Sequence, residues 1–261
     1  VLVAQEEVPV LSHDLASEHY ETVEGKLVLV KECANCDYTT SNEVDTTNPV
    51  EVSNAADLGV VLEAGANVVL TESVDLPTAI VVSKDVTLTI NSGVEITVKN
   101  DTVGDGVFHV TSNATLTLNG EGTVNGVCAN VDGYHMAIWA DGGHVVINGG
   151  TYTNVGATGG ATSTQYDLIY VKNGGSVTIN GGTFISETPK WTLNINDAAD
   201  AGTIVVKGGT FYGYNPASVE TEPAGRNNNF VAEGYEVTEE NGVYRVVEKA
   251  AHTHTEVVDA A

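Results

Sequence analysis

The chain has 261 residues, and its 10 Lys and Arg against 35 Asp and Glu give a formal net charge of −25 at pH 7. This charge argues against a nucleic-acid partner, because binding to phosphates needs clustered Lys and Arg, and against docking on anionic lipid. Hydrophobic residues make up 42% of the chain and charged residues only 17%, so the sequence can bury a core. No apolar run approaches the roughly 18 residues that membrane insertion requires.

Residues 1–48 are predicted to form an N-terminal arm or small module of two β-strands. Cys33 and Cys36 in this module have the spacing of a zinc knuckle, and His13 and His19 lie upstream, so four nitrogen and sulfur donors are available for a zinc site. A disulfide between Cys33 and Cys36 and a pair of free thiols are the alternatives, because the redox compartment decides between them. Calcium is the other candidate ion, since turns rich in Asp and Asn offer oxygen ligands, although no EF-hand loop is present.

The segment VSNAADLGVVLEAG (52–65) predicts a short amphipathic helix. Ser53 or Asn54 is suited to cap its N-terminus, and Leu58, Val61 and Leu62 follow at helical spacing. We expect this helix to cover the first coil of the structure that follows it, because the open end of a stack of strands needs protection.

Residues 49–229 are predicted to form a parallel β-helix of about five to six coils. Their repeated pattern is a small residue, an alternating strand, a Gly-rich turn, Thr and an apolar or aromatic residue. The clearest copies are ATLTLNGEGTVNG (114–126), GHVVINGGTYTNV (143–155), GSVTINGGTFISE (175–187) and GTIVVKGGTFYGY (202–214). The aromatic residues Tyr152, Phe184 and Phe211 share one register, so we expect them to stack from coil to coil at about 4.8 Å per coil. Cys128, in a strand-like run, is expected to be a buried apolar side chain.

The segment FVAEGYEVTEENGVYRVVEK (230–249) predicts a C-terminal hairpin that closes the far end of the solenoid. Its two alternating strands flank Asn241-Gly242, a strong signal for a two-residue turn. Residues 250–261 show no packing pattern and are expected to form a flexible tail.

The VTINGGTF strands, the lead-in AADLGVVLEAGANVVLTESVDLP and the closing hairpin resemble right-handed parallel β-helix domains of the pectin-lyase-like superfamily. The likeness covers about residues 52–248 and is greatest to repeats of bacterial cell-surface and secreted proteins and of phage fibres. It implies an all-β, right-handed parallel β-helix but leaves activity open, because this fold carries lyases, hydrolases, adhesins and inert stalks. EGKLVLVKECANCDYTT and HTHTEVVDAA are similar to the end and the beginning of a Cys-x-x-Cys repeat of the same surface proteins.

The resemblance also implies that a polysaccharide-active site would gather acids on one strand face, and the densest polar and aromatic patch is DGYHMAIWADGGH (132–144). Asp141 and Asp167 are the candidate acid pair. However, the chain has no Asp-x-Asp cluster and no Arg in its coils, and Asp is common at turns for reasons of local hydrogen bonding. Glycan binding without catalysis is the alternative, unless these side chains only pack the core and the loops. The candidate ligand-binding residues are Tyr134, Trp139, Asp141, Tyr166, Asp167 and Trp191.

We therefore expect a non-catalytic structural protein that is extracellular or on a cell or virion surface, either an adhesin-like module or a subunit of a fibre or filament. A polysaccharide-active enzyme or a carbohydrate-binding module on the same scaffold is the alternative. The expected partners are further copies, neighbouring surface subunits or glycans, with no nucleic acid and no membrane insertion. Loops 127–143, 156–168 and 186–200 and the two terminal segments are the expected contact regions.

Overall fold

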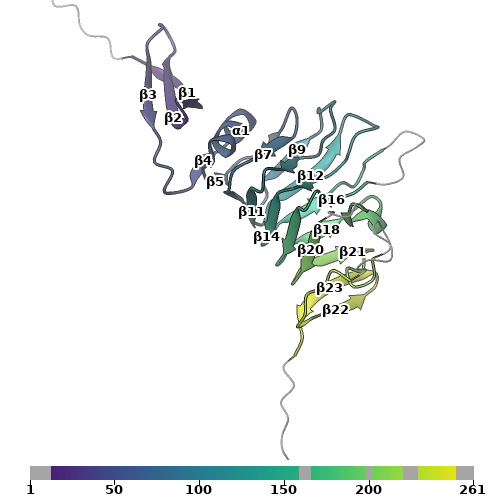
Figure 1. The fold of residues 1–261 in the computed structure, drawn as a ribbon. Helices are drawn as coiled ribbons and strands as arrows, with labels where there is room; N and C mark the ends of the chain where they lie inside the picture. Colours follow the sequence, from purple (N-terminus) through teal and green to yellow (C-terminus); the bar gives the residue numbers. More distant parts are fainter. Residues whose placement is uncertain (1–12, 159–165, 198–201, 220–228, 251–261) are drawn as a thin grey trace, which may run out of the picture.

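A computed structural model of the chain describes residues 13–158, 166–197, 202–219 and 229–250. In these residues the protein is all-β apart from helix α1 (Ala55–Ala64) and the 3-10 turn η1 (Pro189–Trp191). Most strands are parallel and stack in three sheets, which confirms the predicted β-solenoid. A small N-terminal sheet and a C-terminal hairpin lie at opposite ends of this stack (Figure 1).

The three sheets of the solenoid share one stacking direction, and each turn contributes one strand to each sheet. The five-stranded sheet contains β7 (Ile80–Val82), β10 (Phe108–Val110), β13 (Ile138–Asp141), β16 (Ile169–Lys172) and β19 (Leu193–Ile195). The seven-stranded sheet contains β4 (Val50–Val52), β5 (Val68–Leu70), β8 (Val86–Ile90), β11 (Thr115–Gly120), β14 (His144–Ile147), β17 (Ser176–Ile179) and β20 (Thr203–Val206). The eight-stranded sheet contains β6 (Val74–Asp75), β9 (Glu95–Val98), β12 (Thr123–Cys128), β15 (Thr151–Thr153), β18 (Thr183–Ile185), β21 (Thr210–Tyr212), β22 (Tyr235–Glu240) and β23 (Val243–Glu248).

The solenoid has about four turns rather than the five to six that we predicted. After β7 the chain returns to the five-stranded sheet four times, at β10, β13, β16 and β19. Before this, β4 is followed by α1 and has no counterpart in that sheet. Helix α1 lies between β4 and β5 in the chain, where later turns have one strand of the eight-stranded sheet and one of the five-stranded sheet.

The core follows directly from the alternation of side chains along each strand. Inward residues such as Leu88, Leu118 and Ile147 are buried, whereas their strand neighbours face outward. The predicted aromatic stack is confirmed: the rings of Tyr152 and Phe184 are 5.2 Å apart and those of Phe184 and Phe211 are 4.7 Å apart, both pairs within 11° of parallel. This stack fills the interior beside the eight-stranded sheet over three successive turns.

The Gly-Gly turns of the repeat are required by the close approach of neighbouring coils. A Cβ at Gly149 would lie 2.6 Å from the backbone oxygen of Gly120 in the preceding coil, and Gly150 has a φ of +88°. Beside these turns the Asn148 amide donates to Asn119 and the Asn180 amide donates to Asn148, each at 2.8 Å. The Asn and Gly positions of the repeat therefore hold adjacent coils in register.

The N-terminal end of the solenoid is covered by α1, as predicted. The Asp57 backbone N–H donates to Asn54 Oδ1 at 2.9 Å, so Asn54 is the cap, and the helix ends at Gly65 with a φ of 87°. Leu58 and Leu62 of α1 are buried against the solenoid core. The open ends of the first strands are in this way shielded from solvent.

The C-terminal end is covered by the predicted hairpin. The strands β22 and β23 flank Asn241 and Gly242, whose positive φ values of 52° and 75° fit the expected tight turn. Strand β23 pairs antiparallel with β21, which blocks the edge of the eight-stranded sheet. The preceding segment blocks the edge of β20, because the Val206 N–H donates to the Phe230 oxygen at 2.8 Å.

The N-terminal module has three strands, not the two that we predicted: β1 (Leu15–Val23), β2 (Lys26–Cys33) and β3 (Thr39–Glu43) form an antiparallel sheet. The short strand β3 was missed because TTSNE lacks an apolar alternation. The sheet contacts the helical cap, where the Tyr20 N–H donates to Asp57 Oδ1 at 2.8 Å.

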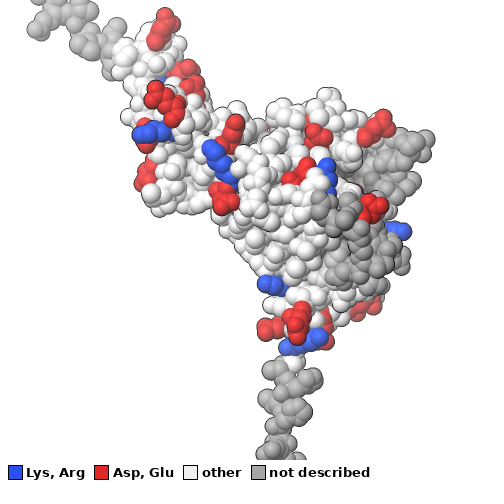
Figure 2. All heavy atoms as spheres, viewed as in Figure 1, with Lys and Arg blue, Asp and Glu red and all other residues white. Residues whose placement is uncertain are grey.

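Charged side chains are unevenly distributed over the surface. In the view of Figure 2 the N-terminal sheet and the C-terminal hairpin carry many Asp and Glu, whereas the face over β11, β14 and β20 carries few charges. The outward residues of β11, β14 and β17 between the turns are Thr115, Thr117, His144, Val146, Ser176 and Thr178. In this view the solenoid body thus offers a face with few charges between two acidic ends.

Candidate functional site

On the outer face of the five-stranded sheet, two residues of the predicted ligand-binding patch, Trp139 and Asp141, meet residues that were not predicted. Parallel pairing aligns His109 of β10, Trp139 of β13 and Tyr170 of β16 in one row across the strands. The same pairing places Asp141 beside Lys172. Because inward neighbours such as Val110 and Ala140 are buried, these polar and aromatic side chains point to the outer surface.

Trp139 is enclosed by its neighbours rather than presented as a free ring. The His109 ring stacks on it with centroids 4.0 Å apart and 2° between the planes. From the following strand, Lys172 places its Nζ 4.3 Å from the centre of the indole. Since His109 and Lys172 come from the strands on either side of β13, both faces of the indole are covered. A sugar ring would have to displace one of them in order to stack there.

Asp141 is the electrostatic centre of this cluster. Its carboxylate lies 3.1 Å from His109 Nε2 and 3.7 Å from Lys172 Nζ, and it accepts a hydrogen bond of 2.5 Å from the Asn173 amide. Burial opposes ionisation, but the contacts with His109, Asn173 and Lys172 outweigh it and hold the pKa of Asp141 below its ordinary value. A carboxylate held ionised in this way is suited to fixing its neighbours in place and is poorly suited to donating a proton.

Of the other predicted residues, Tyr134 lies at the edge of this cluster, and the rest are placed apart from it or are buried. Tyr134 is 59% exposed and its ring centre lies 6.0 Å from that of Trp139. Tyr166 is only 6% exposed and packs edge-on against His135, so it offers no free ring face. Asp167 is half-buried in the loop before β16, and Trp191 is half-buried at the end of η1, where Lys190 lies over its ring.

The two candidate acids, Asp141 and Asp167, lie at opposite ends of their strands. The register pairs Asp141 with Lys172, which is five positions beyond Asp167 along the chain. At about 3.3 Å per extended residue this offset is roughly 16 Å, whereas paired carboxylates of glycosidases are about 5–9.5 Å apart.

A buried polar network behind the patch was not found by sequence reasoning. His135 is 1% exposed and its Nδ1 accepts the Cys128 N–H at 3.2 Å, so the proton resides on Nε2. Burial lowers the pKa of His135 and raises that of the Cys128 thiol. The Asn154 amide donates to the backbone oxygens of His135 and Tyr166 at 2.9 and 3.1 Å and ties these loops together. Cys128 is 7% exposed, which confirms the expectation that it is buried.

A second cluster lies in the N-terminal sheet, where His13 Nδ1 and the sulfurs of Cys33 and Cys36 are all within 4.8 Å of one another. His13 Nδ1 is 3.3 Å from Cys36 Sγ, and the thiols are free. Hydrogen bonds from the Cys36 thiol, the Asn35 backbone and His13 lower the pKa of Cys33 to about 7, and the same pairing raises the pKa of Cys36.

The fourth ligand expected from the sequence, His19, does not join this cluster. It lies on β1 opposite Val30, and its Nε2 contacts Glu21 at 3.0 Å. Among the described residues the possible metal-binding group is therefore His13, Cys33 and Cys36. The described residues contain no comparable cluster of His, Cys, Asp and Glu that would suit calcium.

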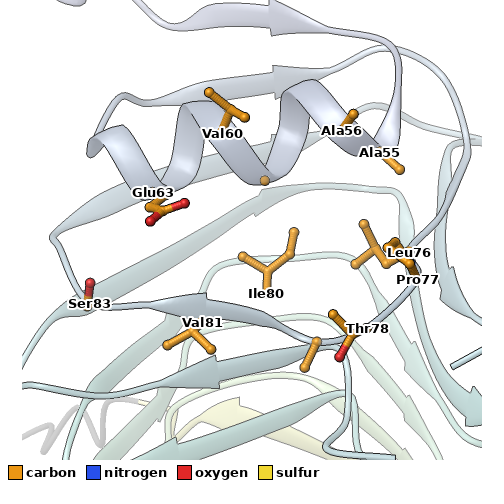
Figure 3. A pocket seen from close by; sticks show the side chains of 12 residues that line it. Ala55, Ala56, Val60, Glu63, Leu76, Pro77, Thr78, Ile80, Val81 and Ser83 are labelled. Carbon is orange, nitrogen blue, oxygen red and sulfur yellow. The ribbon is translucent and has the colours of Figure 1, made fainter. Parts of the chain in front are cut away.

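An apolar groove of about 490 Å³ separates α1 from β7 and the segment that leads into it (Figure 3). Ala55, Gly59 and Val60 line it on the helix side and Ile80 and Val81 on the strand side, and Glu63 is its one charged lining residue. The groove exists because α1 fills only part of the space next to the first strand of the five-stranded sheet. Its lining suits an apolar segment and not acid–base chemistry.

No known family model matches the chain, and comparisons with curated proteins and with solved structures find no significant similarity. Among the described residues, no helix combines the length and the apolar character needed to cross a membrane.

Proposed function

We propose that this chain is a non-catalytic structural module of an extracellular protein on a cell or virion surface, with an adhesin-like role. The observation that carries the proposal is a continuous stack of parallel strands that is covered at both ends, by α1 and by the hairpin β22–β23. Such a body is rigid, since each coil is hydrogen-bonded to the next, and its acidic ends oppose unspecific association. We further propose the pectin-lyase-like β-helices of bacterial surface proteins and phage fibres as its relatives.

The placement of the acids supports a structural role over polysaccharide cleavage. Asp141 is held by contacts with Lys172 and His109, and its offset from Asp167 exceeds the carboxylate spacing of both retaining and inverting glycosidases. The covered faces of Trp139 also count against the carbohydrate-binding alternative, because stacking on sugar rings needs an open face.

The two caps favour a discrete module over a filament built by end-to-end stacking of solenoids. An uncovered edge strand pairs readily with another chain, and the caps remove much of that opportunity. Neighbouring surface subunits would therefore make contact through the outer faces of the sheets and the terminal segments. On the face over β11, β14 and β17, which carries few charges in the view of Figure 2, a partner would meet less charge repulsion than at the acidic ends.

Of zinc and calcium, we propose zinc as the bound ion, at His13, Cys33 and Cys36. Calcium binds oxygen ligands, whereas zinc binds thiolates and imidazoles.

A panel of neutral and acidic polysaccharides tests the functional proposal. We expect neither cleavage products nor retention on any of the immobilised polymers. Cleavage that is lost in Asp141→Asn would overturn the structural role in favour of an enzyme, and retention that is lost in Trp139→Ala would favour a carbohydrate-binding module. Lys99→Ala, an exposed position outside the His109–Trp139–Asp141 cluster, is the matched control.

A further inference from the structure

The group formed by His13, Cys33 and Cys36 is positioned by the backbone of the N-terminal sheet. The Cys33 N–H donates to the Tyr38 oxygen at 2.9 Å, which closes the loop that carries both cysteines. The Ala34 N–H donates to the Asp14 oxygen at 2.9 Å and so holds the start of β1 against this loop. Two segments that are distant in sequence are in this way fixed next to each other.

The imidazole of His13 is itself held in place. Its ring stacks on that of Tyr38 with centroids 3.8 Å apart and 7° between the planes. This contact leaves Nδ1 directed at the sulfurs, 3.3 Å from Cys36 Sγ. His13 and Cys36 are exposed and Cys33 is half-buried, so an ion can reach all three donor atoms from solvent.

The spacing of the donor atoms agrees with that of zinc ligands. Zn–S bonds of about 2.3 Å and Zn–N bonds of about 2.0–2.1 Å at tetrahedral angles place two sulfurs about 3.8 Å apart and a sulfur and a nitrogen about 3.6 Å apart. In the structure all three atoms lie within 4.8 Å of one another. Adjustments of about an ångström would therefore bring the three atoms to the spacing of zinc ligands.

We propose that His13, Cys33 and Cys36 bind one Zn²⁺ ion through Nδ1 and two Sγ atoms, and that the fourth coordination position takes a ligand from outside this group. The inference rests on the choice of zinc made above and goes beyond the structural role, which does not require an ion. Three protein ligands are typical of zinc sites with an exchangeable position, whereas purely structural sites use four. The site is therefore accessible to a solvent molecule or to a donor group of a partner.

The same two sulfurs allow oxidation to compete with zinc. In exchange with a small-molecule disulfide such as oxidised glutathione, one Cys thiolate attacks the disulfide and releases the first thiolate of the reagent. The other Cys then displaces the second thiolate, which leaves a Cys33–Cys36 disulfide and two reduced thiols of the reagent. A disulfide sulfur no longer binds zinc as a thiolate, so the oxidised chain loses the site.

Titration of Zn²⁺ into the reduced full-length chain, in competition with a chromophoric chelator, tests this inference. We expect one tightly bound zinc per chain, no tight binding in Cys33→Ser or Cys36→Ser, and a loss of affinity of at least roughly tenfold in His13→Ala, since even outer-shell changes cost that much. His19→Ala, Cys128→Ser and the pair His252→Ala/His254→Ala are the matched controls and should bind as the unmodified chain does.

Co²⁺ substitution adds a readout that does not depend on affinity, because thiolate-to-cobalt charge-transfer absorption reports the two sulfurs directly. Treatment with oxidised glutathione should abolish this absorption, and reduction should restore it. Circular dichroism of each variant separates loss of the site from loss of the fold. The inference is overturned if the reduced chain binds no zinc, or if zinc binding survives in both folded Cys variants. Either result leaves the proposal of a non-catalytic module standing.

Discussion

Replacing the central phenylalanine of the aromatic stack by a smaller side chain tests how much ring stacking contributes to holding the coils together. Phe184 is fully buried between Tyr152 and Phe211, with ring separations of 5.2 and 4.7 Å. Phe184→Ala should cost about 3–5 kcal/mol, as expected for the loss of a buried phenyl ring. Phe184→Leu keeps most of the apolar volume and removes two ring pairs worth about 0.5–1.5 kcal/mol each, so the lost stacking alone should cost about 1–3 kcal/mol. Because a domain is stable by only about 5–15 kcal/mol, both effects are large enough to measure.

Phe108 provides the matched control for this experiment. It is also fully buried, but its register neighbours are Ile80 and Ile138 rather than aromatic rings. Urea unfolding followed by tryptophan fluorescence gives the free energy of unfolding of the solenoid body for each variant. Phe184→Leu should destabilise it by about 1–3 kcal/mol more than Phe108→Leu does. Equal losses in the two leucine variants would refute the idea that ring stacking, beyond apolar burial, holds the coils together.

Three further predictions concern a buried histidine, a helix cap and a repeat turn. The lowered pKa of His135 means that its contribution to stability is complete above the unfolded value of about 6.5 and is lost as the pH falls through its folded value. His135→Asn should therefore flatten the decrease in the urea midpoint between about pH 6.5 and 5. Asn54→Ala should cost about 0.5–2 kcal/mol, seen as faster hydrogen exchange in α1. Gly149→Ala should lower the thermal midpoint, because its Cβ would meet the Gly120 oxygen at 2.6 Å, whereas Gly156→Ala, where added atoms meet nothing within 4 Å, tests the effect of its positive φ alone.

Much of the fold could be predicted because the residues of the repeat unit indicate where its strands and turns lie. In a stack of coils, the alternation of Val or Ile with Thr indicates a strand and the Gly-Gly pair indicates a tight turn. The recurring aromatic residue indicates a stack of rings. Asn54 and Asn241-Gly242 likewise carry local signals that need no distant partner. The number of turns was overestimated: after β7 the chain returns to the five-stranded sheet four times.

The outer-face cluster was only partly predictable, because its members come from a second repeat that is easily overlooked. GVFHV (106–110), MAIWA (136–140) and DLIYV (167–171) align in the structure, and this alignment stacks His109 on Trp139. An alignment of these three segments places His109 beside Trp139. Extending the alignment by one residue places Lys172 beside Asp141. The burial of Tyr166 could not be foreseen, since it depends on how the loops around Asn154 and Ser186 pack.

In the N-terminal cluster, the sequence predicted the two cysteines but did not decide between the two histidines. The Cys-x-x-Cys spacing pointed to Cys33 and Cys36, and both upstream histidines were plausible partners. Strand register decides between them, because Leu15 pairs with Cys33 and brings His13 to the loop, whereas His19 pairs with Val30 further along the sheet. Antiparallel register of this kind depends on the length of the turn at Gly25, which residue spacing alone does not fix.

The native mass of the purified chain, measured by light scattering over a wide range of concentrations, tests the central claim most directly. A solenoid covered at both ends should remain a single chain of 27.2 kDa at every concentration. A mass that grows with concentration, or filaments in negative-stain images, would contradict the account of a closed module and would place the function in end-to-end assembly.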